Sequence, residues 1–456
     1  MRYFTDKLSA TFPIAAPYIK RLEGDGVGAT LVRGAGGAFI VNVIGTGLMF
    51  ATHVVLARTM GAASYGNFAY AVTWLNILVL FGKLGLDTAS LRFIAEYNGT
   101  EKWGLMKGFV QRSSQISLAA SVVVALTTAA VIWTVRDKIE IELATALWVA
   151  CLILPLQSLL VVRSASLRGL KKVVKAQSAQ RIVRPAILIM AVAAVYLVPR
   201  GALNATTAMA MNLAAFAGAL LFVAFFLKKE LPQNVRQVKS EYKTGMWFRV
   251  ALPMLLLSFM AQGQSNIDII FIGFVLDPQS VGIYSISKKI VGIMIFGLQA
   301  IGFIAAPLIA EYYHKNQILL QRILQISVVC ATLYVILVFI IFVVSFDYLV
   351  LLIGNEYSKS FLPFLILAVG QIVNSSIGLV GLLLTMTAYQ KHAAFIMALA
   401  FISNLLLLLI MVPKFGIAGA AFSMSVSTVL WNLLMYVYVK RYMYIESSIL
   451  SLFWKK

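Results

Sequence analysis

The strongest constraint on this chain is a series of long apolar runs separated by short connections. A helix needs roughly 20 mainly apolar residues to cross the hydrocarbon core of a bilayer. About twelve such runs fit the sequence, which leaves no room for a soluble domain between them. Backbone polar groups inside lipid must bond to one another, so helices are expected to be the whole fold. The expected spans are 36–57, 66–91, 113–135, 143–163, 180–198, 203–227, 248–272, 281–309, 320–345, 362–386, 392–412 and 416–439.

Composition and motifs exclude several classes of protein. Of the 456 residues, 61% are hydrophobic and 12% are charged, about half the charge of a typical soluble domain, which excludes a soluble enzyme. The sequence has no Gly-x-x-x-x-Gly-Lys-Ser/Thr loop, so a nucleotide-driven pump is not expected. The 3 histidines lie in different segments and make no ligand set, so we expect neither a metal nor a cofactor.

The basic residues predict a topology. Lys and Arg number 38 against 17 Asp and Glu, a net charge of +21. Of the 38, 29 fall in the two tails and alternate connections, seven of them between Arg163 and Arg184, and six fall in the other connections. The positive-inside rule then places both termini in the cytoplasm. The basic runs lack interleaved aromatic residues and adjoin spans, so anionic lipids are expected as partners and nucleic acid is not.

An internal repeat is also visible. Three pairs of segments match in the same order at nearly one shift, although a chance similarity of glycine-rich loops is the alternative. The matches are Gly66 and Phe68 with Gly282 and Tyr284 at a shift of 216, Leu167–Lys172 with Met386–Lys391 at 219, and Val198–Ala202 with Val412–Ala418 at about 214. An even number of spans in each half gives parallel repeats, which is a transporter architecture with the substrate path between the halves.

The repeat defines the expected organisation of the chain. A six-helix lobe at 36–227 and a second at 248–440 are joined by a basic cytoplasmic linker at 228–247. A cytoplasmic N-terminal tail occupies 1–35, and a C-terminal tail occupies 441–456. The predicted fold class is an all-α membrane protein of about twelve helices in two six-helix parallel repeats.

Four motifs carry a resemblance to a known family. They are Gly-x-x-x-Tyr-Gly-x-Phe at 61–68, Phe-Ile-Ala-Glu-Tyr at 93–97, Gly-Asn-Glu-Tyr at 354–357 and Pro-Lys-Phe-Gly-Ile-Ala-Gly-Ala-Ala at 413–421. Together they resemble polysaccharide transporters, the flippases of lipid-linked oligosaccharides. That family belongs to the superfamily that also holds the multidrug and toxin extruders. The likeness covers roughly residues 30–440 and leaves the N-terminal tail unmatched. It implies the exporter-superfamily fold and a substrate of undecaprenyl-diphosphate oligosaccharide.

Ionisable residues inside the spans are the first site candidates, because each costs about 2.5–3.5 kcal/mol to insert. Lys83 and Asp87 are four residues apart on one helical face, so they either pair with each other or serve transport. The adjacent Lys288 and Lys289 point about 100° apart, so one acidic residue cannot easily neutralise both. They either extend toward the membrane surface or form a cationic cavity wall. Asp268 or Asp87 is the candidate for coupling to a proton or sodium ion.

Two further sets of residues complete the predicted substrate site. Arg33 and Arg249 lie 216 residues apart, at the cytoplasmic mouths of the first and seventh spans. They are either topology signals or a duplicated pair at the mouth of the cavity. The run that contains Gln262, Gln264 and Asn266 is unusually polar for a lipid-facing helix and suits sugar hydroxyls. The family resemblance implies a cavity formed chiefly by the first, second, seventh and eighth spans.

The sequence therefore predicts a flippase, not an enzyme, in the inner membrane of a bacterium. Lys and Arg in the cavity would compensate the diphosphate, while alternating access moves the headgroup outward for surface polysaccharide synthesis, either O-antigen or exopolysaccharide. The polysaccharide polymerase machinery is a further expected partner. Two alternatives stay open. One is an exporter of drugs or of another lipid-linked precursor, although cationic drugs favour acidic cavities. The other is a membrane-embedded glycan polymerase or ligase, although such enzymes usually need large outer loops.

Overall fold

The structure, a computed structural model, describes residues 27–196, 203–387 and 389–449. It describes the backbone alone for 27–35 and for Tyr196, Leu257, Pro307 and His314. The predicted N-terminal tail and the end of the C-terminal tail therefore lie largely outside the described residues. Within those ranges the regular structure is helical and no strand occurs.

The described helices are numbered in chain order. The α-helices are α3 Val27–Lys83, α4 Leu86–Gly99, α5 Trp103–Val135, α6 Ile141–Gly169, α7 Val173–Ser178, α8 Arg184–Tyr196, α9 Ala205–Glu230, α10 Gln233–Gln237, α11 Thr244–Val275, α12 Pro278–Lys315, α13 Gln317–Val344, α14 Phe346–Ile353, α15 Phe361–Ile377, α16 Val380–Met386 and α17 Gln390–Tyr438. Four short turns of 3₁₀- or π-helix are η2 Arg136–Lys138, η3 Ala179–Val183, η4 Asn355–Ser360 and η5 Val439–Met443.

Ten stretches of the described residues are long and apolar enough to cross a membrane. Two of them, of 48 and 54 residues, contain a glycine in a left-handed conformation, Gly61 at φ +74° and Gly416 at φ +57°. At 1.5 Å per residue each would be roughly 70–80 Å long, against about 30 Å for the hydrocarbon core. Each is thus long enough for two crossings. The prediction of an all-helical membrane protein is confirmed, and the count of twelve spans stays a prediction.

Two expected spans end earlier than their apolar runs. The run at 66–91 is broken at Leu84 and Gly85, which both have positive φ, so Asp87 lies in the first turn of α4 instead of in the second span. The run at 362–386 is broken at Gly378 into α15 and α16. Hydropathy continues across both breaks, and so it could not reveal a change of backbone direction.

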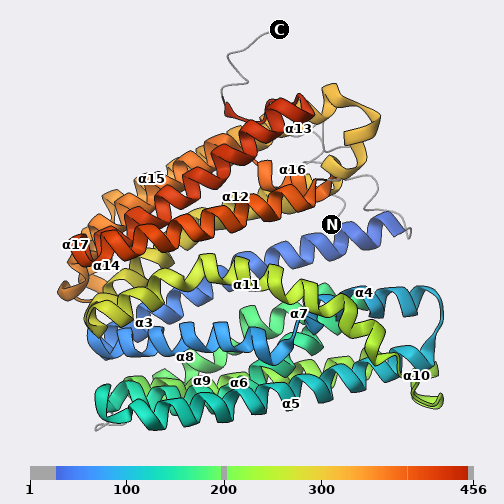
Figure 1. The fold of residues 1–456 in the computed structure, drawn as a ribbon, viewed down its shortest axis with the longest axis horizontal. Coiled ribbons are helices and arrows are strands. Elements are labelled where there is room, and N and C mark those ends of the chain that lie inside the picture. The colour runs from blue at the N-terminus through green and yellow to red at the C-terminus, as the bar shows by residue number, and fades with distance from the viewer. Residues whose placement is uncertain (1–26, 197–202, 388, 450–456) are drawn as a thin grey trace, which may run out of the picture.

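Figure 1 shows the helices as two groups. Helices α12 to α17 lie together in its upper part, and α3 to α9 lie below them. The two groups meet mainly along α3 and α12, while α11 contacts α17 of one group and α3 and α4 of the other. Trp247 anchors the start of α11 to α4 by donating a hydrogen bond to the Tyr97 hydroxyl at 2.9 Å. The lobe boundaries read from the sequence stay a prediction.

The helices α3 and α12 touch backbone to backbone at Gly66 and Gly282, which we call the glycine crossing. A Cβ atom added to Gly66 would lie 1.7 Å from the carbonyl oxygen of Pro278, and one added to Gly282 would lie 2.1 Å from that of Ala62. Real Cβ atoms do not approach so closely, so only glycine fits at either position. The same two glycines are matched at a shift of 216 in the sequence.

The family motifs meet beside this crossing. The break in α3 at Gly61 leaves the N–H of Ala62 without a helical partner, and this N–H donates to Glu356 Oε1 of η4 at 2.8 Å. Next to it, the ring of Tyr357 packs edge-on against Tyr65 at 6.3 Å between centroids. Residues almost 300 positions apart therefore hold the break in α3 in place.

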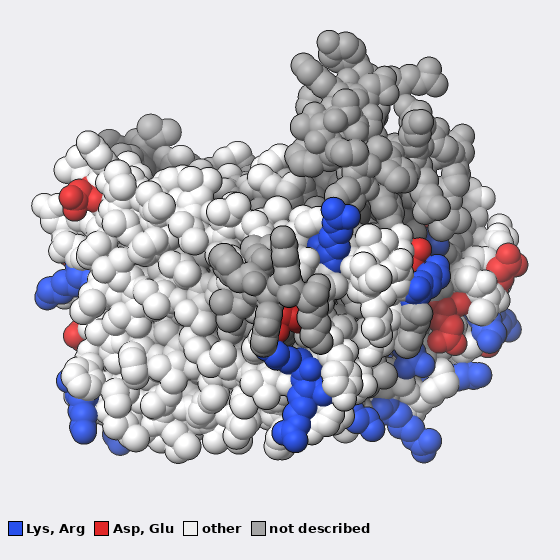
Figure 2. Space-filling view, turned by 90° about the horizontal axis from the view of Figure 1, so that it is seen from above, with Lys and Arg blue, Asp and Glu red and all other residues white. Residues whose placement is uncertain are grey.

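The surface shows where the charges lie. Figure 2 shows a broad face almost free of charge, with Lys and Arg gathered mainly toward the end at the right of the view. In Figure 1 this is the end where α4 and α10 lie. An uncharged belt beside a basic end is the surface expected of a protein whose helices lie in a bilayer.

Candidate functional site

A polar cavity of about 290 Å³ lies between α3, α11 and α12, close to the glycine crossing. Helix α3 supplies almost half of its lining, α12 supplies both lysines, and η3 supplies one arginine. The lining residues are Thr46, Met49, Phe50, His53, Phe68, Ala69, Val72, Thr73, Asn76, Arg181, Ser265, Asn266, Ile269, Ser285, Lys288, Lys289, Gly292, Ile293, Phe296 and Gln299.

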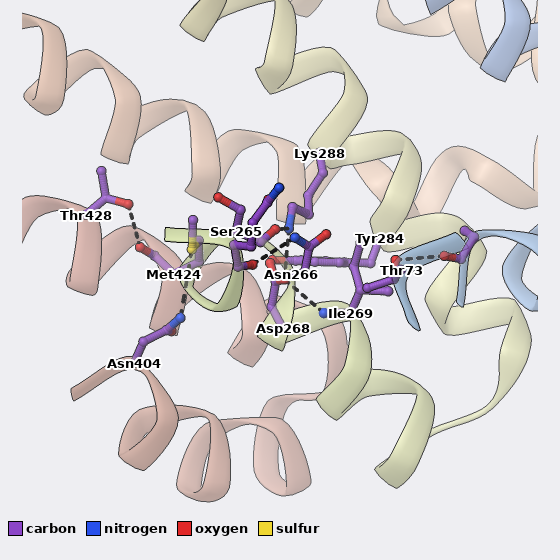
Figure 3. Close-up of polar contacts among 12 residues, drawn as sticks. Thr73, Ser265, Asn266, Asp268, Ile269, Tyr284, Lys288, Asn404, Met424 and Thr428 are labelled. Atoms are coloured by element: carbon purple, nitrogen blue, oxygen red, sulfur yellow. Dashed lines mark hydrogen bonds and ion pairs between the residues drawn. The ribbon is translucent and has the colours of Figure 1, made fainter. Parts of the chain in front are cut away.

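One wall of the cavity holds a buried ion pair. Asp268 of α11 is fully buried, and Lys288 of α12 places its Nζ 2.8 Å from Asp268 Oδ1 and 2.7 Å from the carbonyl oxygen of Ser265. The Tyr284 hydroxyl donates to the other carboxylate oxygen at 2.6 Å. Figure 3 shows Lys288 and Tyr284 converging on Asp268. Asp268 thus neutralises one of the two adjacent lysines.

The second lysine is placed differently. Lys289 lines the same cavity, yet among the described residues no acceptor or acidic side chain lies within bonding distance of its ammonium group. A charge left unpaired in a buried site costs free energy unless a ligand or water compensates it. Lys289 therefore presents to the cavity an ammonium group that no described residue neutralises.

Arg181 joins this cationic wall and Arg184 lies in a smaller chamber, and the sequence analysis misplaced both. It counted Arg181 and Arg184 among the basic residues of a cytoplasmic connection, and this was wrong. Both lie inside the candidate span Val173–Val195, with Arg181 on the cavity described above. The signal was available, because both arginines fall within the apolar run at 180–198 and are therefore intramembrane charges.

Arg184 lines a smaller chamber of about 100 Å³, which Lys289 and His53 share with the main cavity. Its guanidinium donates to Asn212 Oδ1 at 3.2 and 3.3 Å and lies 4.1 Å from the centroid of the Phe216 ring. These neutral partners orient the guanidinium and leave its positive charge uncompensated. Sequence analysis also missed His53, whose Nδ1 lies 3.0 Å from the Tyr65 hydroxyl.

The polar run of α11 divides between the cavity and the helix packing. Asn266 lines the cavity, whereas Gln264 donates a 2.8 Å hydrogen bond to Ser427 of α17. Gln262 is exposed and does not contact the cavity. Only one of these three predicted residues therefore lines the cavity.

The remaining predicted residues lie elsewhere. Lys83 and Asp87 form a mutual ion pair of 2.6 Å outside the cavity lining, as the pairing interpretation expected. Arg249 is exposed on α11 and is not a lining residue. Arg33 belongs to α3, but its side chain lies outside the described residues.

No metal centre is evident in the described part of the chain. There, no group of three or more His, Cys, Asp or Glu side chains is arranged to hold an ion. The cavity presents Lys and Arg instead, which are groups that bind phosphate and carboxylate by charge-assisted hydrogen bonds.

Comparison with known families identifies the chain. Residues 31–313 match the family described as polysaccharide biosynthesis protein. The chain belongs to this family. A relative from Haloferax volcanii, the probable low-salt glycan biosynthesis flippase Agl15, is 25% identical over 406 residues, covering 88% of this chain and 82% of the relative.

Solved structures share the fold at low sequence identity. An inward-facing transporter of the MATE family superposes with a TM-score of 0.69 at 14% identity, covering 88% of this chain and 97% of that one. The lipid II flippase MurJ, in an inward closed conformation, gives 0.67 at 12% identity, covering 90% and 87%. The predictions of the family and of the exporter-superfamily fold are confirmed. The chain is a multi-pass membrane protein of the polysaccharide biosynthesis protein family.

Proposed function

We propose that the protein is a flippase that moves a polyprenyl-diphosphate-linked oligosaccharide, of the undecaprenyl type, across a membrane. One observation carries the proposal: a cavity inside the span region whose lining includes Arg181 and Lys289, a lysine with no partner among the described residues. A diphosphate must leave water to cross the bilayer, and fixed cations replace the hydration that it loses. The glycan relative named above supports this choice of cargo.

The polar neutral residues of the cavity suit the sugar. Asn76, Asn266 and Gln299 offer both donors and acceptors to hydroxyl groups, and all three line the cavity. The rim residue Phe296 stacks with Phe39, whose side chain is 40% exposed, so the cavity borders an apolar surface. The polyprenyl chain can then stay in lipid while the headgroup crosses.

In this proposal the two helix groups rock about the cavity to give alternating access. The protein lies in a bacterial inner membrane with both termini in the cytoplasm, and it passes its cargo to the polysaccharide polymerase machinery outside. The glycan serves a surface polysaccharide, either O-antigen or exopolysaccharide. Two rival functions are less well supported. A drug exporter for cations does not suit a cavity wall of Lys and Arg, and a polymerase would need catalytic groups in place of this wall.

A reconstitution assay tests the proposal. Purified protein in liposomes should move a lipid-linked oligosaccharide between leaflets, measured by its accessibility to an external lectin, while empty liposomes should not. A Glu230→Gln variant is a matched control, since it removes a carboxylate that pairs with Lys172 and Lys175 outside the cavity. If correctly folded protein does not move the lipid-linked oligosaccharide, or exports cationic drugs instead, the proposal is overturned.

A further inference from the structure

The ion pair between Asp268 and Lys288 has an unusual position for a purely structural contact, because it forms part of the cavity wall. Lys288 keeps 19% of its side chain exposed, whereas Asp268 is fully buried behind it. The two side chains therefore differ in whether a ligand in the cavity can contact them. An anion in the cavity reaches the lysine and does not reach the carboxylate.

Asp268 is held in place independently of Lys288. Its Oδ2 accepts from the Tyr284 hydroxyl at 2.6 Å, and its Oδ1 accepts from the Ile269 N–H at 2.9 Å. Removal of Lys288 would leave both of these hydrogen bonds intact. The carboxylate is thus the fixed member of the pair.

Lys288 is the member that can move. Its ammonium group has three donors on a flexible four-carbon stem. Asp268 and the Ser265 carbonyl oxygen accept two of those donors, which leaves one for the cavity. An incoming phosphate can bind the third donor first and then draw the ammonium away from Asp268.

The neighbouring Lys289 needs no such exchange, because no described group neutralises it. A first phosphate can bind Lys289 without breaking a hydrogen bond or ion pair of the described residues, and Arg181, whose guanidinium contacts only the Met49 sulfur there, lines the same cavity. A second phosphate must compete with Asp268 for Lys288. The two lysines therefore differ in whether an anion must first displace a carboxylate.

We propose that Asp268 is an internal counter-ion that competes with the second phosphate of the cargo for Lys288, and that this competition permits release. This inference rests on the proposed function and assigns roles within the same site. When the cavity opens to the far side, Lys288 returns to Asp268 and the diphosphate loses one of its cations. Without the competitor, the cargo would bind more tightly and leave more slowly.

Binding of two short probes tests the assignment. Farnesyl diphosphate and farnesyl monophosphate are titrated against the purified full-length protein and its variants in nanodiscs. Asp268→Asn should bind the diphosphate about tenfold more tightly and the monophosphate less than threefold more tightly, while transport of the full lipid-linked substrate slows. Lys289→Met should weaken both probes, and Lys288→Met should weaken the diphosphate more. Glu230→Gln, which removes a carboxylate paired with lysines outside the cavity, should leave the ratio of the two affinities unchanged.

Each other outcome counts against the inference. An equal gain for both probes in Asp268→Asn would show that the aspartate acts through general charge, and weaker binding of both would show a structural role. If this variant does not fold, the double variant Asp268→Asn with Lys288→Gln keeps the pair neutral. It should bind the two probes about equally, and a retained preference for the diphosphate would overturn the assignment. Failure of the wild type to bind either probe would instead contradict the proposed function.

Discussion

Helices α3 and α12 meet in two very different ways within a short distance. At the glycine crossing their backbones touch, and no space remains for a Cβ atom on Gly66 or Gly282. Six residues after Gly282, the same pair of helices encloses a cavity lined by Lys288 and Lys289. That distance is roughly 9 Å along a helix. The size of the side chains, and not the path of the helices alone, decides where α3 and α12 are in close contact and where a cavity lies between them.

The difference has a consequence for transport. A sealed contact between two rigid helices can open as a unit, since it depends on close packing with few specific bonds. The cavity beside it holds charges whose partners can change. The glycine crossing is therefore expected to control whether the transporter can close at this end, and the cavity is expected to control what it carries.

The largest effect on transport is expected when a side chain is added at the glycine crossing. Gly66→Ala forces α3 away from Pro278, so transport should be lost and the free energy of unfolding should fall by about 1–3 kcal/mol, as in other overpacked sites. Transport in liposomes and the melting temperature measure the two effects. Gly47→Ala, in the same helix, meets nothing within 4 Å and is the control. Equal behaviour of the two variants would refute the role of the crossing.

The second-largest effect is expected at Lys289, where a substitution should lower transport without lowering stability. Lys289→Met removes a charge-assisted contact to the cargo worth about 1.5–3 kcal/mol, so transport should fall roughly 10- to 100-fold. Because this lysine has no partner among the described residues, the melting temperature should hold or rise. Lys288→Met should instead lower it, since Asp268 loses its counter-ion. A fall in stability for Lys289→Met would show that a partner holds its ammonium group.

A smaller effect is expected at the second chamber. Arg184→Lys keeps the charge but loses the paired hydrogen bonds to Asn212 and part of the stacking on Phe216. Binding of farnesyl diphosphate should weaken severalfold, and Arg184→Met should weaken it further. If the lysine variant binds as well as wild type, charge alone matters in this chamber and the geometry of the guanidinium does not.

The smallest effect should come from the contact that borders the crossing. Glu356 is exposed and accepts one hydrogen bond from the Ala62 N–H, so Glu356→Ala should lower the melting temperature by less than half of the change for Gly66→Ala. Glu356→Gln keeps an acceptor oxygen and should behave nearly as wild type. A larger decrease in melting temperature than that of Gly66→Ala would show that the contact with η4 stabilises this part of α3 more than the glycine crossing does.

The sequence predicted the nature of the fold because hydropathy is a local property. Runs of apolar residues that long can only be membrane helices, and their motifs indicated the family that the comparisons confirmed. Local hydropathy did not reveal the breaks at Gly85 and Gly378, because a glycine changes the backbone direction without changing the polarity of the run. Nor did a count of charges by connection detect that Arg181 and Arg184 lie inside a span.

The sequence showed Lys83, Asp268, Lys288 and Lys289 as charges inside apolar runs, although it did not separate Arg181 and Arg184 from a connection. Their partners were decided by the tertiary structure. Lys83 pairs with a residue four positions away, whereas Lys288 pairs across two helices with Asp268 and Lys289 pairs with none of the described residues. Helix packing places the ammonium groups of Lys83 and Lys288 at 2.6 and 2.8 Å from a carboxylate oxygen and leaves that of Lys289 facing the cavity. Sequence spacing cannot supply that distance between helices, and the proposed difference between the two cavity lysines depends on it.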